Sequence, residues 1–305
     1  MSAVAGTFDR RDAIDTAAVA FMILLTFSWG FNGVAAKITN TGYNPVFMNV
    51  VRSAIGAALV FGWCRWRAIP LFENDGTLVP GIVAGLLFGG EFTLIFFGLD
   101  YTTVARSALM VNTMPFWVLI GAHFLLGERM SLVKLAGLTL AFCGVALVFS
   151  DQLSLPSPEA IKGDLMSICA GILWAATTLV IKTTKLARIG AEKLLLYQLA
   201  VSAVMAIPLI PLAGPALRDV SAIATAALVF QAIYIVAFTY ILWFWLVRRY
   251  PAAGLSSFAF LTPAFGVLLG GLLLGEPLTW KLFGALGLIA VGLVIVNRPS
   301  RRREA

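Results

Sequence analysis

The amino-acid sequence predicts an all-α membrane protein with ten transmembrane helices, arranged as two inverted five-helix repeats with both termini in the cytoplasm. The composition, the regular spacing of apolar segments and an internal duplication support this prediction. Of the 305 residues, 60% are hydrophobic and only 12% are charged, whereas roughly 25% of the residues in a soluble domain are charged. A water-soluble fold cannot bury so much apolar surface, so we expect a lipid bilayer to surround most of the chain.

Ten apolar segments recur along the chain, and each is long enough to cross a hydrocarbon core of about 30 Å as a helix. A helix can span the bilayer because it satisfies its backbone hydrogen bonds internally. The predicted spans cover approximately residues 16–36, 45–64, 78–98, 103–125, 131–150, 163–182, 193–213, 221–246, 252–274 and 279–297.

The basic residues of the short connections predict the orientation of the chain. Connections on one side of the predicted membrane hold 16 Lys and Arg residues, and those on the other side hold 5. Cytoplasmic loops carry the excess of positive charge, so both termini are expected in the cytoplasm. The formal charge of +7 therefore reflects topology, and scattered Lys and Arg give no indication of a nucleic-acid partner.

Two stretches of the sequence repeat the same residues at matched spacing. Ala105 precedes Pro115 by ten residues, as Ala253 precedes Pro263, and an LLGE tetrapeptide follows each proline at the same distance. The segments 29–37 and 174–182 both begin with Trp and end with Lys.

The chain therefore divides into a cytoplasmic segment 1–15, a first repeat 16–150, a second repeat 163–297 and a basic cytoplasmic tail 298–305. A unit with five spans leaves its copy starting on the opposite face, so the repeats are predicted to be inverted. Inverted repeats favour alternating access around a substrate site near the bilayer midplane.

The sequence resembles the drug/metabolite transporter superfamily, specifically its EamA-type ten-helix members. The segment GLDYTTVARSALMVNTMPFWVLIGAHFLLGERMSLVKLAG, its weaker copy, the pattern SWGFNGVAAK and Arg52 carry this resemblance. The second copy departs from the pattern, because Pro277 stands where the first copy has Arg129. A symmetric role for the two LLGE turns is therefore not expected.

The resemblance implies a secondary transporter in a bacterial inner membrane, acting as a monomer or homodimer without a cofactor. The chain is most similar in character to bacterial exporters of aromatic amino acids. A cavity lined mainly by helices one, three, four, six, eight and nine is implied, with helices five and ten packing or dimerising. Another cargo on the same fold, such as a drug, a nucleotide sugar or another metabolite, is the alternative, followed by a passive channel.

Glu91 is the carboxylate deepest within a predicted span. An ionised group in a bilayer costs about 2.5–3.5 kcal/mol on insertion scales, so Glu91 should face the interior of the bundle with a partner. It is predicted either to bind a substrate ammonium or a coupling proton, or to form a structural ion pair. Arg52 and Arg106 fall at similar depths and are the candidate partners.

Other polar and aromatic residues lie away from the predicted loops and are candidates for substrate binding. Such groups can orient a zwitterion while aromatic faces hold an apolar side chain; each could equally serve helix packing. The candidates are Trp29, Asn32, Asn112, Thr113, Trp174, Thr178, Gln231, Tyr234, Tyr240 and Ser257.

Pro115 and Pro263 lie about halfway along the fourth and ninth spans. Proline removes one backbone hydrogen bond and bends a helix. Because the two prolines occupy matched positions, we predict that both are hinges. No metal site or catalytic set is expected, since the chain has one histidine and three scattered cysteines.

Overall fold

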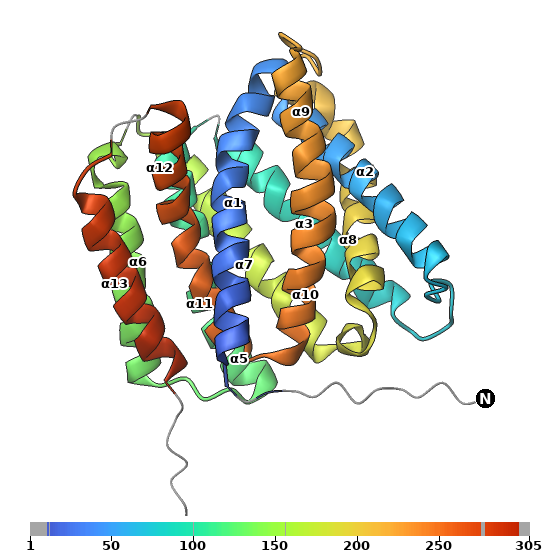
Figure 1. The fold of residues 1–305 in the computed structure, drawn as a ribbon, viewed down its shortest axis with the longest axis horizontal. Coiled ribbons are helices and arrows are strands. Elements are labelled where there is room, and N and C mark those ends of the chain that lie inside the picture. Colours follow the sequence, from blue (N-terminus) through green and yellow to red (C-terminus); the bar gives the residue numbers. More distant parts are fainter. Residues whose placement is uncertain (1–10, 12, 100, 156, 276–277, 299–305) are drawn as a thin grey trace, which may run out of the picture.

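The computed structural model (Figure 1) describes residues 11–298 except for 12, 100, 156, 276 and 277. The described part of the chain is helical and contains no β-strand. Eight helical segments are long and apolar enough to cross a membrane, and two shorter apolar helices, Leu132–Val148 and Lys281–Asn297, occupy the predicted fifth and tenth spans. A 17-residue helix is about 25 Å long.

The first repeat contains six helices. They are α1 (Thr16–Gly42), α2 (Pro45–Trp66), α3 (Leu78–Gly98), α4 (Val104–Val111), α5 (Met114–Leu126) and α6 (Leu132–Val148). Polar side chains accept hydrogen bonds from free amides at several starts: Asp15 from Ala18 N at 2.8 Å and Asn44 from Val46 N at 2.8 Å.

Among its described residues, the second repeat contains seven helices and four segments of different helical pitch. The helices are α7 (Ala160–Thr183), α8 (Ala191–Ala206), α9 (Ala222–Phe230), α10 (Tyr240–Arg249), α11 (Ala252–Ser257), α12 (Leu261–Leu274) and α13 (Lys281–Asn297). A 3-10 segment, Ile207–Ala213, extends α8, and a π-helical segment, Gln231–Thr239, joins α9 to α10. Another 3-10 segment, Phe258–Phe260, joins α11 to α12, and a short one, Lys185–Arg188, follows α7.

The two spans with matched prolines are both interrupted just before the proline. Pro115 lies in the first turn of α5, after a break from α4 at Asn112 and Thr113. Pro263 lies in the first turn of α12, after the 3-10 segment. Helix α5 then ends at Gly127 and α12 at Gly275, each with a φ of +69°. This is a left-handed conformation that glycine adopts without strain.

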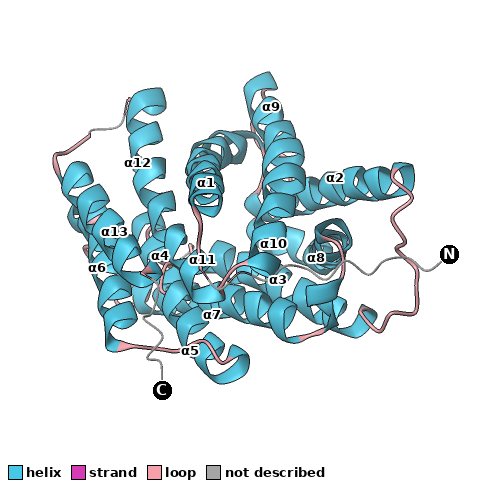
Figure 2. Cartoon of the chain, turned by 60° about the horizontal axis from the view of Figure 1, so that its bottom comes forward, coloured by secondary structure: helices cyan, strands magenta, loops and turns pink. Residues whose placement is uncertain are grey.

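The two repeats are interleaved. The most extensive contacts join α1 to α12, α2 to α8, α3 to α7 and α8, α5 to α7, and α6 to α13, so they connect one repeat with the other. Figure 2 shows α6 and α13 side by side at one edge. Their backbones approach closely because small residues face each other: a Cβ on Gly137 would lie 2.9 Å from the Gly292 carbonyl oxygen.

The helix ends define two faces of the bundle. The start of α1 and the end of α13 lie at the same end (Figure 1), which we call the terminal face. Here Arg11 N donates to the carbonyl of Arg249 at 2.8 Å, and Tyr250 Oη donates to Asp15 at 3.0 Å. The opposite face holds the end of α3 and the starts of α4, α7 and α13.

Candidate substrate cavity

A cavity of about 220 Å³, here called the central cavity, lies between the two repeats. Aromatic side chains form most of its wall: Trp29, Phe88, Phe92, Trp174, Tyr240, Trp243 and Phe244. Its polar lining consists of Asn32, Glu91, Thr177, Thr178, Gln198 and Thr262, with Ile95 and Val111 completing the wall. Helices α1, α3 and α4 of the first repeat and α7, α8, α10 and α12 of the second supply these residues.

Trp29 is the centre of the aromatic wall. Its ring centroid lies 5.6 Å from that of Trp243 and 6.3 Å from those of Trp174 and Tyr240, all in edge-to-face geometry. Its indole N–H donates to Thr239 Oγ1 at 3.0 Å. Each such aromatic pair contributes about 0.5–1.5 kcal/mol beyond area burial, so the ring is held firmly in one orientation.

Glu91 is 5% exposed and its side chain faces the central cavity. Within the described part of the chain, no basic side chain forms an ion pair with it. Arg52 lies near enough for an electrostatic interaction, but its Nε donates to Asn49 Oδ1 at 3.1 Å and its guanidinium lies 4.6 Å from the Phe92 ring centroid. Arg52 therefore packs against Phe92 of the cavity wall, and Glu91 lines the cavity without a direct ion pair to Arg52.

Three more lining side chains have buried polar atoms without a hydrogen-bond partner among the described residues. They are Asn32 Oδ1, both amide atoms of Gln198 and Thr262 Oγ1. An unsatisfied buried polar group costs about 1–3 kcal/mol. The three side chains lie around one cavity, so they add polar groups to a wall that is otherwise mostly aromatic.

A second cavity of about 250 Å³, the side cavity, adjoins the central cavity. The two share Ile95, Val111, Trp174 and Thr262. The side cavity continues to Leu99 at the end of α3 and to Val104 at the start of α4, where Val104 is 73% exposed. The combined space therefore leads from the middle of the bundle towards the opposite face.

The terminal face below the central cavity is closed by packing and by charged side chains. Residues 252–257 of α11 are all buried. The Lys182 ammonium donates to the carbonyls of Val247 at 2.8 Å and Tyr250 at 2.5 Å. The Glu128 carboxylate accepts from the backbone N–H of Ala252 at 2.8 Å and Ala253 at 3.3 Å.

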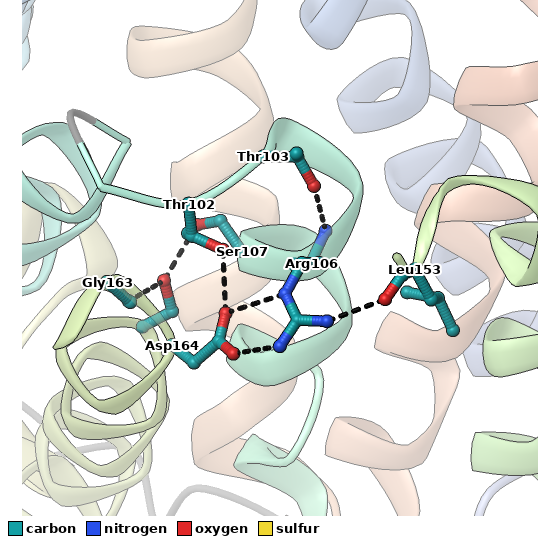
Figure 3. A network of polar contacts seen from close by, with 8 residues as sticks. Thr102, Thr103, Arg106, Ser107, Leu153, Gly163 and Asp164 are labelled. Atoms are coloured by element: carbon teal, nitrogen blue, oxygen red, sulfur yellow. Dashed lines mark hydrogen bonds and ion pairs between the residues drawn. The ribbon is translucent and has the colours of Figure 1, made fainter. Parts of the chain in front are cut away.

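Arg106 forms a buried polar network on the opposite face (Figure 3). Its guanidinium makes an ion pair with Asp164, and its Nη1 donates to the Leu153 carbonyl at 2.6 Å. Thr102 Oγ1 donates to the same carboxylate at 2.7 Å. This network joins the α3–α4 connection, the α6–α7 connection and the start of α7. The partner of Arg106 is Asp164 and not Glu91, which corrects the pairing considered from the sequence.

The structure separates the sequence-predicted binding residues into two groups. Glu91 and five others line the central cavity, and Asn112 lines the side cavity; the five are Trp29, Asn32, Trp174, Thr178 and Tyr240.

The remaining four candidates lie outside both cavities. Gln231 Nε2 donates to Thr39 Oγ1 at 2.8 Å, and Tyr234 Oη is 3.0 Å from Ser28 Oγ, so both join the second repeat to α1. Thr113 Oγ1 donates to the Met110 carbonyl at the break between α4 and α5, and Ser257 is buried in the closed terminal face. Assigning these four to substrate contact is not supported by their positions.

Sequence reasoning missed several residues that line the central cavity or close the terminal face. Gln198 and Thr262 are polar residues within predicted spans, and this was the available signal for them. Lys182 was matched to Lys37 by the repeat. Trp243, Phe244, Phe88 and Phe92 gave no signal, because aromatic residues are frequent in every span.

These features are those of a multi-pass membrane transporter: apolar helices in two interleaved repeats and a cavity between them. The chain belongs to the EamA-like transporter family, which matches residues 16–150 and 161–298 as two copies. This confirms the drug/metabolite transporter resemblance.

Several known proteins are similar over nearly the full length. The chain is 25% identical over 286 residues to the Bacillus subtilis protein "Uncharacterized transporter YoaV", covering 93% of this chain and 97% of that protein. It is 25% identical over 296 residues to the "Probable amino-acid metabolite efflux pump" of Escherichia coli, covering 93% and 95%. A crystal structure with 20% identity superposes with a TM-score of 0.82, covering 96% of this chain and all of that one, which shows the shared fold.

Proposed function

We propose that this protein is a secondary transporter that exports small amphipathic metabolites, with aromatic or other apolar amino acids as the favoured substrates. The observation that carries the proposal is the central cavity, in which aromatic rings from both repeats surround the Glu91 carboxylate. That a relative is named as an amino-acid metabolite efflux pump supports the cargo class.

The position of the cavity supports alternating access. Trp29 and Trp174 occupy matched positions in the two repeats, and their rings meet at 6.3 Å on the cavity wall. Residues related by an inverted repeat meet only near the axis that relates the two copies. We therefore place the substrate site at this axis, near the midplane of a ten-helix bundle whose repeats are 16–150 and 163–297.

The charge of the cavity favours a zwitterion over anionic cargo. The central cavity of about 220 Å³ and the adjoining side cavity of about 250 Å³ together fall within the roughly 300–1,000 Å³ of small-molecule pockets. Phosphate esters would need Lys or Arg on the wall, whereas Glu91 is the charged residue of the lining. In the proposed complex the ammonium meets Glu91, amides such as Gln198 meet the carboxylate, and the aromatic faces hold the side chain.

The distribution of Lys and Arg supports an orientation in a bacterial inner membrane in which the terminal face is exposed to the cytoplasm. The cavities lead to the opposite face while α11 is buried at the terminal face. In that orientation the structure corresponds to an outward-open state. Exchange of the two repeats' conformations, with bending at Pro115 and Pro263, would expose the site to the cytoplasm.

Counterflow in proteoliposomes tests the proposal. Vesicles loaded with unlabelled phenylalanine should accumulate labelled phenylalanine with saturation, and tryptophan or leucine should compete while glutamate should not. Conductance without saturation would indicate a channel, and competition by none of the amino acids would refute the proposed cargo.

Variants of the cavity locate the site. Glu91→Gln should abolish or strongly reduce counterflow and change its pH profile, and Gln198→Leu should weaken substrate affinity. Gln231→Leu is the matched control for Gln198→Leu, because Gln231 is as deeply buried as Gln198 but lies outside both cavities. It should leave substrate affinity unchanged. Correctly folded Glu91→Gln protein with unchanged transport and an unchanged pH profile would exclude both functional roles of this carboxylate.

A further inference from the structure

A third cavity of about 420 Å³ lies at the terminal face, remote from the central cavity. It is bounded by the α5–α6 turn, the start of α11 and the end of α13. Four of its lining side chains are cationic: Arg11, Arg129, Lys134 and Arg298. We call this cavity the basic pocket. The proposed transport cycle gives it no role.

The described residues supply little negative charge to the basic pocket. Glu128 also lines it, but both of its carboxylate oxygens accept hydrogen bonds from the first backbone amides of α11. Arg11 forms an ion pair with Asp15. Among the residues that the structure describes, no carboxylate forms an ion pair with Arg129, Lys134 or Arg298. Within the described part of the chain, these three cations therefore share one pocket without an ion-pair partner, and Glu128 is the carboxylate in the lining.

The second repeat shows that this arrangement is not required by the fold. Lys134 near the start of α6 is matched in the repeat by Lys281 at the start of α13. Lys281 Nζ is neutralised on the opposite face by Asp151 Oδ1 at 2.5 Å, with Ser150 Oγ at 3.0 Å. The position of Arg129 is Pro277 in the second copy. Lys281 is thus neutralised by a carboxylate that follows α6, whereas Lys134 has no ion-pair partner among the described residues.

The surroundings of the basic pocket fit a lipid better than a free ion. The pocket lies at the ends of apolar helices, where the head groups of a bilayer would be. The neighbouring side chains of Leu132, Val133, Phe124 and Leu125 are exposed hydrophobic groups, suited to acyl chains. Basic pockets between transmembrane helices on the cytoplasmic side bind acidic lipid head groups.

We propose that the basic pocket binds the phosphate of an anionic phospholipid, with Arg129, Lys134 and Arg298 as its ligands and the acyl chains along α5 and α6. The assignment to the inner leaflet rests on the proposed orientation. The binding itself depends on neither the orientation nor the transported substrate.

Native mass spectrometry of the delipidated full-length protein tests this, with added phosphatidylglycerol or phosphatidylcholine as the probe. The wild type should retain phosphatidylglycerol in preference to phosphatidylcholine. The double variant R129Q/K134Q should bind it about thirtyfold more weakly, the factor expected when two charges of about 1 kcal/mol each are lost. R65Q/R67Q is the matched control, since it removes two exposed arginines from the same face and should bind as the wild type does.

Three results would overturn the proposal: unchanged phosphatidylglycerol binding by R129Q/K134Q, equal retention of both lipids by the wild type, or displacement of the lipid by equimolar sn-glycerol 3-phosphate. The last would identify a site for soluble phosphate esters. Arg298→Gln, at the end of α13, is a second test variant in case the double variant fails to fold. It should weaken the binding of phosphatidylglycerol and leave that of phosphatidylcholine unchanged. Because no transported substrate is present, these outcomes are separate from those of the counterflow experiment.

Discussion

The ion pair between Arg106 and Asp164 should be a major determinant of stability. The two side chains are 14% and 10% exposed, and the guanidinium is fixed further by the Leu153 carbonyl. In Asp164→Asn, the new amide can still accept from Thr102, but it no longer neutralises Arg106. Removing one partner of a buried pair costs about 3–5 kcal/mol, because the other charge stays buried and unpaired.

A second ion pair on the same face supplies the comparison. Lys281 and Asp151 are 23% and 66% exposed, and exposed pairs contribute about 0–1 kcal/mol. Asp151→Asn should therefore have little effect, although it removes the same charge at the same end of the bundle.

Thermal unfolding of detergent-solubilised protein measures both variants. Asp164→Asn should lower the midpoint by many degrees and Asp151→Asn by one or two at most. The double variant Asp164→Asn/Arg106→Gln should regain part of the loss, since it removes the unpaired charge. Equal effects of the two single variants, or no recovery in the double variant, would refute the reasoning from burial.

Further predictions concern packing and pH. A Cβ on Gly163 would lie 2.5 Å from the Gly98 carbonyl oxygen, so Gly163→Ala should separate α3 from α7 and cost about 1–3 kcal/mol of thermal stability; Gly287→Ala, with open space around the new methyl group, should not. Burial alone would raise the pKa of Asp75, but the hydrogen bond from Lys193 and other interactions outweigh it and lower the pKa from 3.8 to about 2. As the pH falls, Asp75 is protonated in the unfolded chain before it is protonated in the folded protein. Its contribution to the free energy of unfolding is therefore complete above about pH 4 and is lost as the pH falls towards 2. A melting series from pH 2 to 6 should show this loss in the wild type and a smaller one in Asp75→Asn.

The helical architecture was largely accessible from the sequence because it depends on local properties. Apolar length sets a membrane helix, and the predicted starts at 16, 45 and 78 coincide with those of α1, α2 and α3. The matched prolines indicated where two spans are interrupted, because a missing N–H acts on its own helix. The duplication was visible for the same reason, as it needs only a comparison of the chain with itself.

The direction in which individual side chains point could not be predicted from the sequence. Sequence gives the depth of a residue in the bilayer, but a helix that is apolar on all sides does not reveal which side faces a cavity. The eighth span shows this most clearly. Its π-helical segment, Gln231–Thr239, has wider turns than an α-helix, which changes the angular spacing of side chains. Gln231 and Tyr234 consequently face α1, while Tyr240 faces the central cavity.

Asp164 was missed for a different reason. It is the fifth residue of α7 and lies at the edge of a predicted span, where charged residues are common and carry no signal. Its importance comes from Arg106, which is 58 residues away along the chain. Only the packing of α4 against α7 brings the two together.

The closed terminal face depends on the corner between α10 and α11, where two charged side chains bind helix ends. Carbonyls at the end of a helix and amides at its start lack partners within the helix, and the helix dipole favours a cation at the former and an anion at the latter. Lys182 and Glu128 fulfil these two roles at the same corner.

The two contacts should nevertheless respond differently to mutation. Lys182 and the end of α10 belong to one repeat, so their contact can persist while the repeats exchange conformations. Glu128 reaches from the first repeat to the second, so its contact with α11 has to break before the terminal face can open. Lys182→Met should therefore mainly lower the melting temperature, since hydrogen bonds of charged groups contribute about 1.5–3 kcal/mol each. Glu128→Gln should mainly shift the protein towards the state open at the terminal face, measured as faster labelling of a cysteine introduced at Ser257. If Lys182→Met opens the terminal face as much as Glu128→Gln does, the distinction between a contact within one repeat and a contact between the two repeats is wrong.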